Sequence, residues 1–302
     1  MTATERKVTV DGKTLLMTSE VRDDPARRAA FNRLTRQVFG FDFQAWYDGG
    51  YWGDRYIPYL LLEGDRAVAN VSVNVMDFQT AQGPRWLGQL GTVMTDPGCR
   101  GRGFCRLLLE QVLEEWTGQC DGIYLYANQT VLGLYPKFGF HRQEELQHVG
   151  TPPPPNGLGV RRLEMGREAD RRLLLRAYKQ SNPFSACAMT DNQGLLMFYC
   201  TGMMKNDVYH IPELDAVAVA LYSGHTMVLA DVFCGGGMPM EAVVGALAEP
   251  GTTRVVYGFS PLDPRGCSPK PMRQEDTVLF ALGDWDGVFQ DPSVMMPLLS
   301  HA

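Results

Sequence analysis

The sequence predicts an α/β protein with mixed sheets and two similar halves, and three observations indicate this class. Apolar residues recur at helical spacing over residues 25–39 and then alternate with small or polar residues over 56–62 and 67–79, as in a half-buried hairpin. Strands then alternate with helices, which requires a sheet with both parallel and antiparallel neighbours. The order strand, turn, helix, strand returns beyond residue 216.

The first half contains the other elements of one such layered structure. Its aromatic stretch, residues 39–56, interrupts regular structure with glycine pairs. The elements predicted after the hairpin are a strand over 86–95, a helix over 103–116, a strand over 121–128, a short helix, the LYPKFGF segment over 134–140 and a strand that ends near Val149. We therefore expect a complete mixed α/β layer structure in the first 150 residues.

A proline-rich segment divides the chain. TPPPPNG, residues 151–157, favours an extended, semi-rigid spacer, because proline is excluded from helix interiors and central strands. We place a domain boundary there, between a domain over 1–150 and a domain over 158–302. The elements predicted in the second domain are a helix over 166–181, strands over 216–223 and 226–233, a helix over 240–248 and a strand over 253–260.

Composition and charge exclude several classes of protein. The formal net charge of −6 argues against a nucleic-acid partner. No run approaches the roughly 18 apolar residues of a membrane helix, and the first residues lack the apolar core of a secretory signal, so we expect a cytoplasmic protein without a membrane partner. Seven scattered cysteines without a CxxC pair, and five dispersed histidines without an HExxH motif, predict reduced thiols and no metal.

The turn TDPGCRGRGF, residues 95–104, carries the strongest chemical signal. It joins a strand to a helix through Arg100, Gly101, Arg102 and Gly103, where a helix start normally has Ser, Thr, Asp or Asn. Glycine exposes backbone N–H groups and accepts positive φ, and the helix dipole adds partial positive charge. The pattern predicts an anion site for phosphate or pyrophosphate, and a solvated loop is the alternative. Since neither GxxxxGKS/T nor GxGxxG is present, a different phosphate-bearing ligand is expected.

Two segments together resemble the coenzyme A site of the GNAT N-acetyltransferase superfamily. They are VMTDPGCRGRGFCRLLLE and, at the right separation, IYLYANQTVLGLYPKFGF. The family pattern Arg/Gln-x-x-Gly-x-Gly/Ala is matched, except that Cys105 replaces the last small residue. The resemblance implies acetyl-CoA as co-substrate, with no metal. The residues that it implies for coenzyme binding are Val93, Met94, Thr95, Arg100, Gly101, Arg102, Gly103, Phe104, Cys105, Asn128 and Tyr135.

The resemblance also implies catalytic roles. A backbone N–H near Val93 would polarise the thioester carbonyl, and Tyr135 would protonate the leaving thiolate, since a free thiol has a pKa of about 8.5 and tyrosine one of about 10. Without the preceding motif, Tyr135 would be interpreted as a packed aromatic residue. Some two-domain relatives place the final carboxylate of the chain in the site as a base. Ala302 or His301 could take that part here, and a terminus docked on the surface is the alternative.

The acceptor side is expected in WYDGGYWGDRY, residues 46–56, where family members line the acceptor pocket. Trp46 and Trp52 could hold a cation by cation–π contact. Asp48 or Asp54 could attract an ammonium group or take its proton through water. The alternative is that the aromatic residues only hold an irregular loop together.

The sequence therefore predicts a GNAT acyltransferase fold followed by a degenerate GNAT-like α/β domain that completes the acceptor site. In that second domain, Gly235, Gly236 and Gly237 are expected only to make a tight turn. The predicted function is an acetyl-CoA-dependent N-acetyltransferase that acts by direct attack of a primary amine of a small molecule, such as an aminoglycoside-like compound, a polyamine or a metabolite. A non-catalytic coenzyme A sensor or regulatory module is the alternative.

Overall fold

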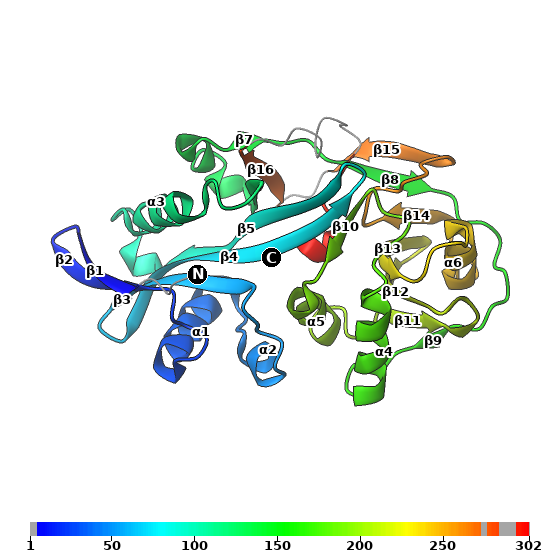
Figure 1. Cartoon of the computed structure of the whole chain (residues 1–302), viewed down its shortest axis with the longest axis horizontal. Coiled ribbons are helices and arrows are strands. Elements are labelled where there is room, and N and C mark those ends of the chain that lie inside the picture. The colour runs from blue at the N-terminus through cyan, green and yellow to red at the C-terminus, as the bar shows by residue number, and fades with distance from the viewer. Residues whose placement is uncertain (1–4, 273–276, 284–293, 302) are drawn as a thin grey trace.

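Two mixed sheets form the framework of the protein (Figure 1). The computed structural model describes residues 5–272, 277–283 and 294–301. Within these ranges, no helix is long and apolar enough to cross a membrane. Nor do the described His, Cys, Asp and Glu side chains form a group of three or more that could hold a metal ion.

The first sheet belongs mainly to the first half of the chain. Its strands, in spatial order, are β1 (Glu5–Val10), β2 (Lys13–Thr18), β3 (Tyr56–Glu63), β4 (Arg66–Thr80), β5 (Gly83–Thr95), β6 (Gly122–Ala127), β16 (Val278–Leu282) and β7 (His141–Arg142). β10 (Cys187–Thr190) pairs with the far end of β4. Among the described strands of this sheet, β5 and β6 are the one parallel pair, because helix α3 (Phe104–Trp116) connects them as a crossover.

The second sheet has the same mixture of pairings. Its strands, in spatial order, are β15 (Cys267–Pro271), β8 (Leu146–Gly150), β14 (Arg254–Tyr257), β13 (Thr226–Phe233), β12 (Ala216–Ser223), β11 (Val208–Ile211) and β9 (Arg161–Arg162). β13 and β14 are parallel, joined through a helix, and the other neighbours are antiparallel.

Helices cover both faces of the first sheet and pack between the two sheets (Figure 1). The α-helices are α1 (Pro25–Phe39), α2 (Gln44–Asp48), α3 (Phe104–Trp116), α4 (Glu168–Tyr178), α5 (Gln193–Thr201) and α6 (Met240–Leu247). The 3₁₀ helices are η1 (Pro97–Cys99), η2 (Gln129–Val131), η3 (Tyr135–Phe138), η4 (Pro212–Leu214) and η5 (Leu298–Ser300). α3 buries its apolar side on one face of the first sheet, and α1 packs on the other face.

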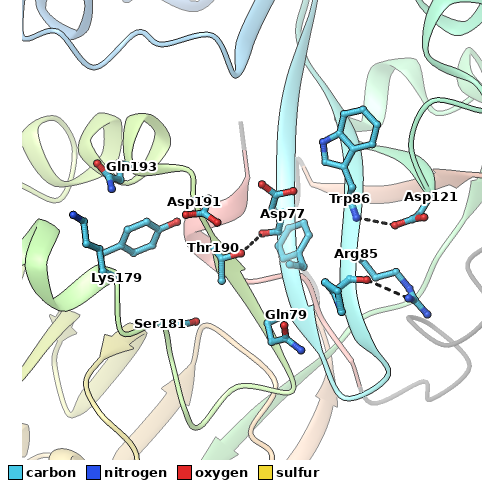
Figure 2. A pocket seen from close by; sticks show the side chains of 13 residues that line it. Asp77, Gln79, Arg85, Trp86, Asp121, Lys179, Ser181, Thr190, Asp191 and Gln193 are labelled. Atoms are coloured by element: carbon cyan, nitrogen blue, oxygen red, sulfur yellow. Dashed lines mark hydrogen bonds between the residues drawn. The ribbon is translucent and has the colours of Figure 1, made fainter.

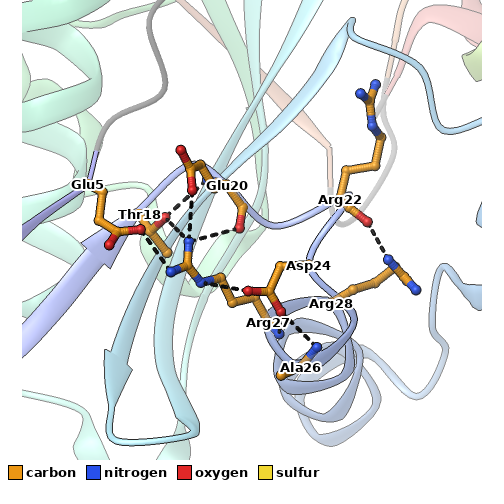
Figure 3. A network of polar contacts seen from close by, with 8 residues as sticks. All are labelled: Glu5, Thr18, Glu20, Arg22, Asp24, Ala26, Arg27 and Arg28. Atoms are coloured by element: carbon orange, nitrogen blue, oxygen red, sulfur yellow. Dashed lines mark hydrogen bonds and ion pairs between the residues drawn. The ribbon is translucent and has the colours of Figure 1, made fainter.

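Helix α1 has sharply defined ends. The Asp24 side chain accepts hydrogen bonds from backbone N–H groups of the first turn, and Gly40 ends the helix in the left-handed conformation at φ 82°. Arg27 in the first turn is largely buried, and it ties the helix to the amino-terminal strands. Its oxygen partners are Glu5, Thr18, Glu20 and Asp24 (Figure 3). This network fixes α1 against the sheet on which the site is built.

The second half repeats the central order of the first. β12, β13, α6 and β14 follow one another as β4, β5, α3 and β6 do, with an antiparallel pair and then a parallel pair. Each antiparallel pair contains a register shift, between Asn70 and Ser72 in β4 and between Val219 and Ala220 in β12. The α/β class with two similar halves is therefore confirmed.

Some strands on each side of the proline-rich segment pair in the sheet of the other half. β8 precedes residues 151–157 in the chain but pairs in the second sheet, whereas β16 follows them but pairs between β6 and β7 in the first. β10 likewise reaches the first sheet from the second half. A domain boundary at 151–157 stays a prediction, and the two sheets are tied together by strands on either side of it.

Candidate active site

The first sheet opens at the middle of β5. The parallel register of β5 and β6 ends at the pair Leu90 and Leu125, and beyond it the two strands separate. On its other side, β5 carries a bulge, because Gly91 pairs with Ser72 whereas Met94 pairs with Asn70. The β6-facing edge of residues 91–95 is therefore left without a paired strand from β6.

A side-chain amide stabilises this bulge. Asn70 donates hydrogen bonds from Nδ2 to the Thr92 carbonyl (2.9 Å) and to Ser72 Oγ (2.8 Å). Thr92 has a positive φ of 48°, a conformation that costs energy in a threonine. The Thr92 hydroxyl is also hydrogen-bonded to the Tyr56 hydroxyl. The bulge is thus held from both sides, as expected where a strand must turn its backbone towards a ligand.

A cavity of about 1000 Å³ lies beside the opened edge. Most of the predicted coenzyme-binding residues line it, namely Val93, Met94, Thr95, Arg100, Gly101, Cys105, Asn128 and Tyr135. Trp46 and His301, which were predicted for the acceptor side and for the proton acceptor, line it as well. The structure therefore brings together residues from four separate parts of the sequence.

The turn before α3 has open space in front of it. Gly101 and Gly103 have φ values of 76° and 81°, which explains why these positions favour glycine. A Cβ at Gly101 would meet no atom within 4 Å, and one at Gly103 would only touch Val10 at 4.0 Å. Helix α3 has no side-chain cap, so its first N–H groups are free to face an anion.

The two arginines of the turn differ in their surroundings. Arg102 donates from Nε to the Asp11 carboxylate (2.6 Å), which raises the pKa of its guanidinium, and it lies over the Phe104 ring. Phe104 itself is buried in the core under α3. Arg100 is exposed, lines the cavity and forms no ion pair with another described residue. The cavity wall does not include Arg102, Gly103 or Phe104. The unpaired positive charge at the cavity therefore comes from Arg100.

Tyr135 lies in η3, lines the cavity and is 4% exposed. Burial raises the pKa of its phenol, and the neighbouring Cys105 adds to this effect, so the phenol is protonated at neutral pH. Burial also raises the pKa of the Cys105 thiol to about 11. Cys105 therefore presents a neutral thiol and not a thiolate nucleophile.

Asn128 stands at the end of β6, where it caps η2. Its Oδ1 accepts a hydrogen bond from the Thr130 N–H (3.0 Å), which fixes the side chain at the cavity wall. Its amide nitrogen keeps two donors that can serve a ligand carbonyl. Asn128 therefore lies at the cavity wall with free donors, and its role in coenzyme binding stays a prediction.

The segment 294–301 packs between the halves and brings His301 to the cavity. The His301 ring stacks on Tyr126, with centroids 3.9 Å apart, and its carbonyl accepts a hydrogen bond from the Tyr199 hydroxyl. Burial lowers the pKa of His301 to about 4, so the imidazole is neutral at physiological pH. Ala302, the other predicted proton acceptor, lies outside the described residues.

Comparisons with known proteins agree with this geometry. Residues 21–140 match the model of the Acetyltransferase (GNAT) family. The chain therefore contains, over residues 21–140, a domain similar to the GNAT acetyltransferases. A comparison with curated proteins finds no match.

Solved structures show the same fold over most of the chain. A probable N-acyltransferase from Enterococcus faecalis V583 is 12% identical, with a TM-score of 0.61 over 93% of this chain and 72% of that one. A GCN5-related N-acetyltransferase from Kribbella flavida is 17% identical (TM-score 0.57; 88% and 70% covered). Eis1 from Mycobacterium abscessus is 15% identical (TM-score 0.57; 85% and 72% covered). At these identities the likeness concerns the fold, and it includes the second half.

In the GNAT-like second half, the two central parallel strands, β13 and β14, do not separate. The Gly258 N–H, just after β14, donates to the Leu229 carbonyl (2.8 Å), and a Cβ on Gly258 would lie 2.7 Å from the Ala230 backbone. The Gly258 carbonyl in turn accepts from the Leu298 N–H (2.7 Å). β14 therefore stays against β13 at the point where, in the GNAT domain, β6 leaves β5.

Three of the residues predicted for the acceptor side do not line the cavity. Asp54 is exposed and forms an ion pair with Arg22, and Asp48 is exposed and accepts from Gln44 Nε2 (2.8 Å). Trp52 is buried behind the wall in an aromatic cluster. The proposed acceptor contacts are therefore corrected to exclude these three residues, and Trp46 remains.

The cavity wall near Trp46 instead contains residues for which no role was predicted. Phe41 and Phe43 follow α1, and Leu195, Phe198, Tyr199 and Met203 come from α5 and the turn after it. Phe198 stacks on Phe43 with centroids 5.5 Å apart. The aromatic stretch 39–56 was a usable signal for the first group, but only the fold brings α5 to it.

A second cavity, of about 670 Å³, lies between the β4–β5 hairpin and the start of α5 (Figure 2). It is lined by side chains of both charges, including Asp77, Asp191, Arg85 and Lys179. Asp121 on its rim accepts a hydrogen bond from the Trp86 N–H (2.7 Å). None of the predicted site residues lines this cavity, so the candidate chemistry is concentrated in the first one.

Proposed function

We propose that the protein transfers an acetyl group from acetyl-CoA to a primary amine of a small molecule. The observation that supports this most strongly is the meeting, in one cavity, of the uncapped start of α3, the unpaired edge of β5 and the buried phenol of Tyr135. These are a site for a phosphate, a row of backbone groups for an extended amide chain, and a proton donor.

The turn before α3 would bind the pyrophosphate of the co-substrate. Backbone N–H groups from Gly101 to Cys105 supply hydrogen bonds, and Arg100 supplies charge. Met94 and Thr95 lie on the bulged strand, whose free edge would pair with the pantetheine amides, and the Asn128 amide would donate to the same arm. Cys105 lets the helix approach, since its side chain is only slightly larger than alanine.

The chemical step is a direct attack. The amine nitrogen forms a bond to the thioester carbonyl carbon, the carbon–sulfur bond breaks, and the amine loses one proton while the thiolate gains one. The Val93 backbone N–H, at the bulge, would polarise the carbonyl oxygen. Tyr135 would supply the proton to the thiolate, which a protonated phenol can do.

The proton acceptor for the amine is proposed to be a water beside His301. No carboxylate from the described residues lines the cavity, and the neutral His301 imidazole, with a pKa of about 4, is a weak base. A water beside His301 would carry the proton from the amine to solvent.

The experiment that tests this function measures release of coenzyme A thiol from acetyl-CoA, with and without amines, beside the shift in melting temperature that acetyl-CoA produces. Amine-dependent thiol release with an upward thermal shift is expected. No thermal shift would contradict the coenzyme site. A thermal shift without thiol release, across amines of every class, would contradict the reaction and favour a coenzyme A sensor.

A further inference from the structure

The acceptor part of the cavity is aromatic and carries no acidic group. Of all described residues that line the cavity, none is Asp or Glu, and the one permanently charged side chain is the cation of Arg100. A compound with several ammonium groups needs carboxylates to replace its hydration, because an unpaired buried charge is costly. This wall offers none to a polyamine or an aminoglycoside.

The rim of the cavity exposes large apolar side chains to solvent. Among the described residues, five large apolar side chains are exposed, and three of them line this cavity: Phe39 (44%), Phe41 (43%) and Met203 (72%). Apolar groups that gather in one exposed concave place are typical of a site for an apolar ligand. The two exposed side chains elsewhere are Val160 and Leu262.

Four aromatic side chains of the wall already use their polar atoms in hydrogen bonds within the protein. The Trp46 indole N–H donates to the Gly194 carbonyl (2.8 Å), and the Tyr199 hydroxyl donates to the His301 carbonyl. The Tyr126 hydroxyl donates to Glu145 (3.1 Å), and the Tyr56 hydroxyl is paired with Thr92. These residues therefore present ring surface to an acceptor, and few free donors for a polyhydroxylated sugar.

We infer that the acceptor is a monoamine on an aromatic or similarly apolar scaffold, such as an arylalkylamine, and not a polycation. This inference rests on the proposed function, because it identifies the acceptor of that same reaction. The apolar part of the acceptor packs against Phe41, Phe198 and Met203. The single ammonium group can lie over a ring face before it loses its proton.

The first test compares kcat/KM with acetyl-CoA for 2-phenylethylamine, ethanolamine, spermidine and kanamycin. 2-Phenylethylamine and ethanolamine each carry one ammonium group, so their ratio isolates the apolar contact. We expect 2-phenylethylamine to exceed each of the other three by about tenfold or more, as burial of a phenyl ring allows. Equal or better use of spermidine or kanamycin would overturn the inference and leave the proposed function standing. No thiol release with any amine would contradict the proposed function itself.

Variants of the rim provide a second, independent test. Phe41→Ala should lower kcat/KM for 2-phenylethylamine by about tenfold and that for ethanolamine by less than about twofold. Leu262→Ala, an exposed apolar residue outside the cavity, is the matched control and should change neither. If Phe41→Ala instead raised the KM for octanoyl-CoA and left 2-phenylethylamine unchanged, the wall would hold an acyl chain and the inference would be overturned.

A charge introduced at the rim should redirect the preference. Met203→Glu should raise kcat/KM for spermidine about threefold to tenfold relative to Met203→Gln, which has the same shape without the charge. Met203 is 72% exposed, so neither substitution disturbs the core. An equal effect of the two variants on spermidine would contradict the view that the missing carboxylates exclude polycations.

Discussion

Asn70 holds the Thr92 carbonyl with a 2.9 Å hydrogen bond, and through it the bulge that turns the β5 backbone towards the cavity. The two residues lie on neighbouring strands, 22 positions apart in the chain. The amide nitrogen of Asn70 also reaches Ser72, so one buried side chain fixes both strands at the point where the sheet opens. The unpaired strand edge is therefore stabilised by hydrogen bonds within the protein.

Asn70→Ala should loosen this edge. Loss of the buried donor is expected to lower the free energy of unfolding by about 1–3 kcal/mol, because the Thr92 carbonyl loses its partner. It should also weaken acetyl-CoA binding several-fold. Denaturant melts and calorimetric titration measure the two effects. Ser72→Ala, which leaves the contact between Asn70 and Thr92 in place, should have the smaller effect on binding, and the reverse order would contradict the assigned role.

The two arginines of the turn should contribute unequally to coenzyme binding. Arg100→Ala removes the unpaired charge and is expected to weaken coenzyme A binding about fivefold to tenfold at low salt, with a smaller difference at high salt. Arg102→Ala should weaken it by about twofold or less, since Arg102 is already paired with Asp11. Titrations at two salt concentrations test this, and equal losses would show that the ion pair does not divide their roles.

Gly101→Ala should act through backbone conformation and not through a clash. Its φ of 76° is strained for alanine, while a Cβ there would meet no atom within 4 Å. We expect a loss of about 1–2 kcal/mol in stability or in coenzyme binding. Gly236→Ala is the matched control, because that position also has free space but no positive φ. Comparable losses in both variants would contradict the conformational explanation.

The stability of the protein should fall between about pH 4 and pH 7 through two buried carboxyls. Burial raises the pKa of Glu145 and that of Asp231 to about 7 each, above the values of about 4.3 and 3.9 in an unfolded chain. The folded state therefore binds more protons in this range. Their contribution is fully present below about pH 4 and is lost as the pH rises through 7. His301 opposes this trend, because its lowered pKa adds stability that is lost as the pH falls below about 6.5.

Glu145→Gln removes one of these two buried carboxyls and so tests its contribution to the pH dependence alone. Relative to the parent protein, its free energy of unfolding should rise with pH and gain about 1–3 kcal/mol between pH 4.5 and pH 8. Denaturant melts across this range measure the difference. Glu114→Gln, on the exposed side of α3, serves as the control for the exchange of Glu for Gln itself.

Local signals in the sequence were sufficient to predict the main elements around the proposed coenzyme site. The helix predicted over 25–39 has those bounds, and the one predicted over 103–116 begins one residue later, because Asp24, Gly40 and Gly103 define the ends. The glycine turn and the tyrosine after β6 depend on neighbours in the chain, so their roles could be expected from pattern. Helices α2 and α5 and several strands were not predicted, namely β1, β2, β9, β10, β11, β15 and β16. Strands β10 and β16, for example, are defined by partners more than 100 residues away.

The acceptor side depends on contacts between distant parts of the chain. Nothing local distinguishes Trp46, which lines the cavity, from Trp52, which packs behind it. Asp54 forms an ion pair with Arg22, 32 positions earlier. Phe198 reaches the cavity only because α5 packs beside α2. Sequence pattern therefore predicted a segment that reaches the cavity, but not which of its side chains line it.

The most direct test of the account is a comparison of Tyr135→Phe with the parent protein, by steady-state turnover and by titration with acetyl-CoA. We expect kcat to fall by about a hundredfold, because the proton donor to the thiolate is lost. The Kd for acetyl-CoA should change by less than about threefold. A variant that keeps most of its turnover, or that loses binding and turnover equally, would contradict the role of Tyr135 at the centre of this site.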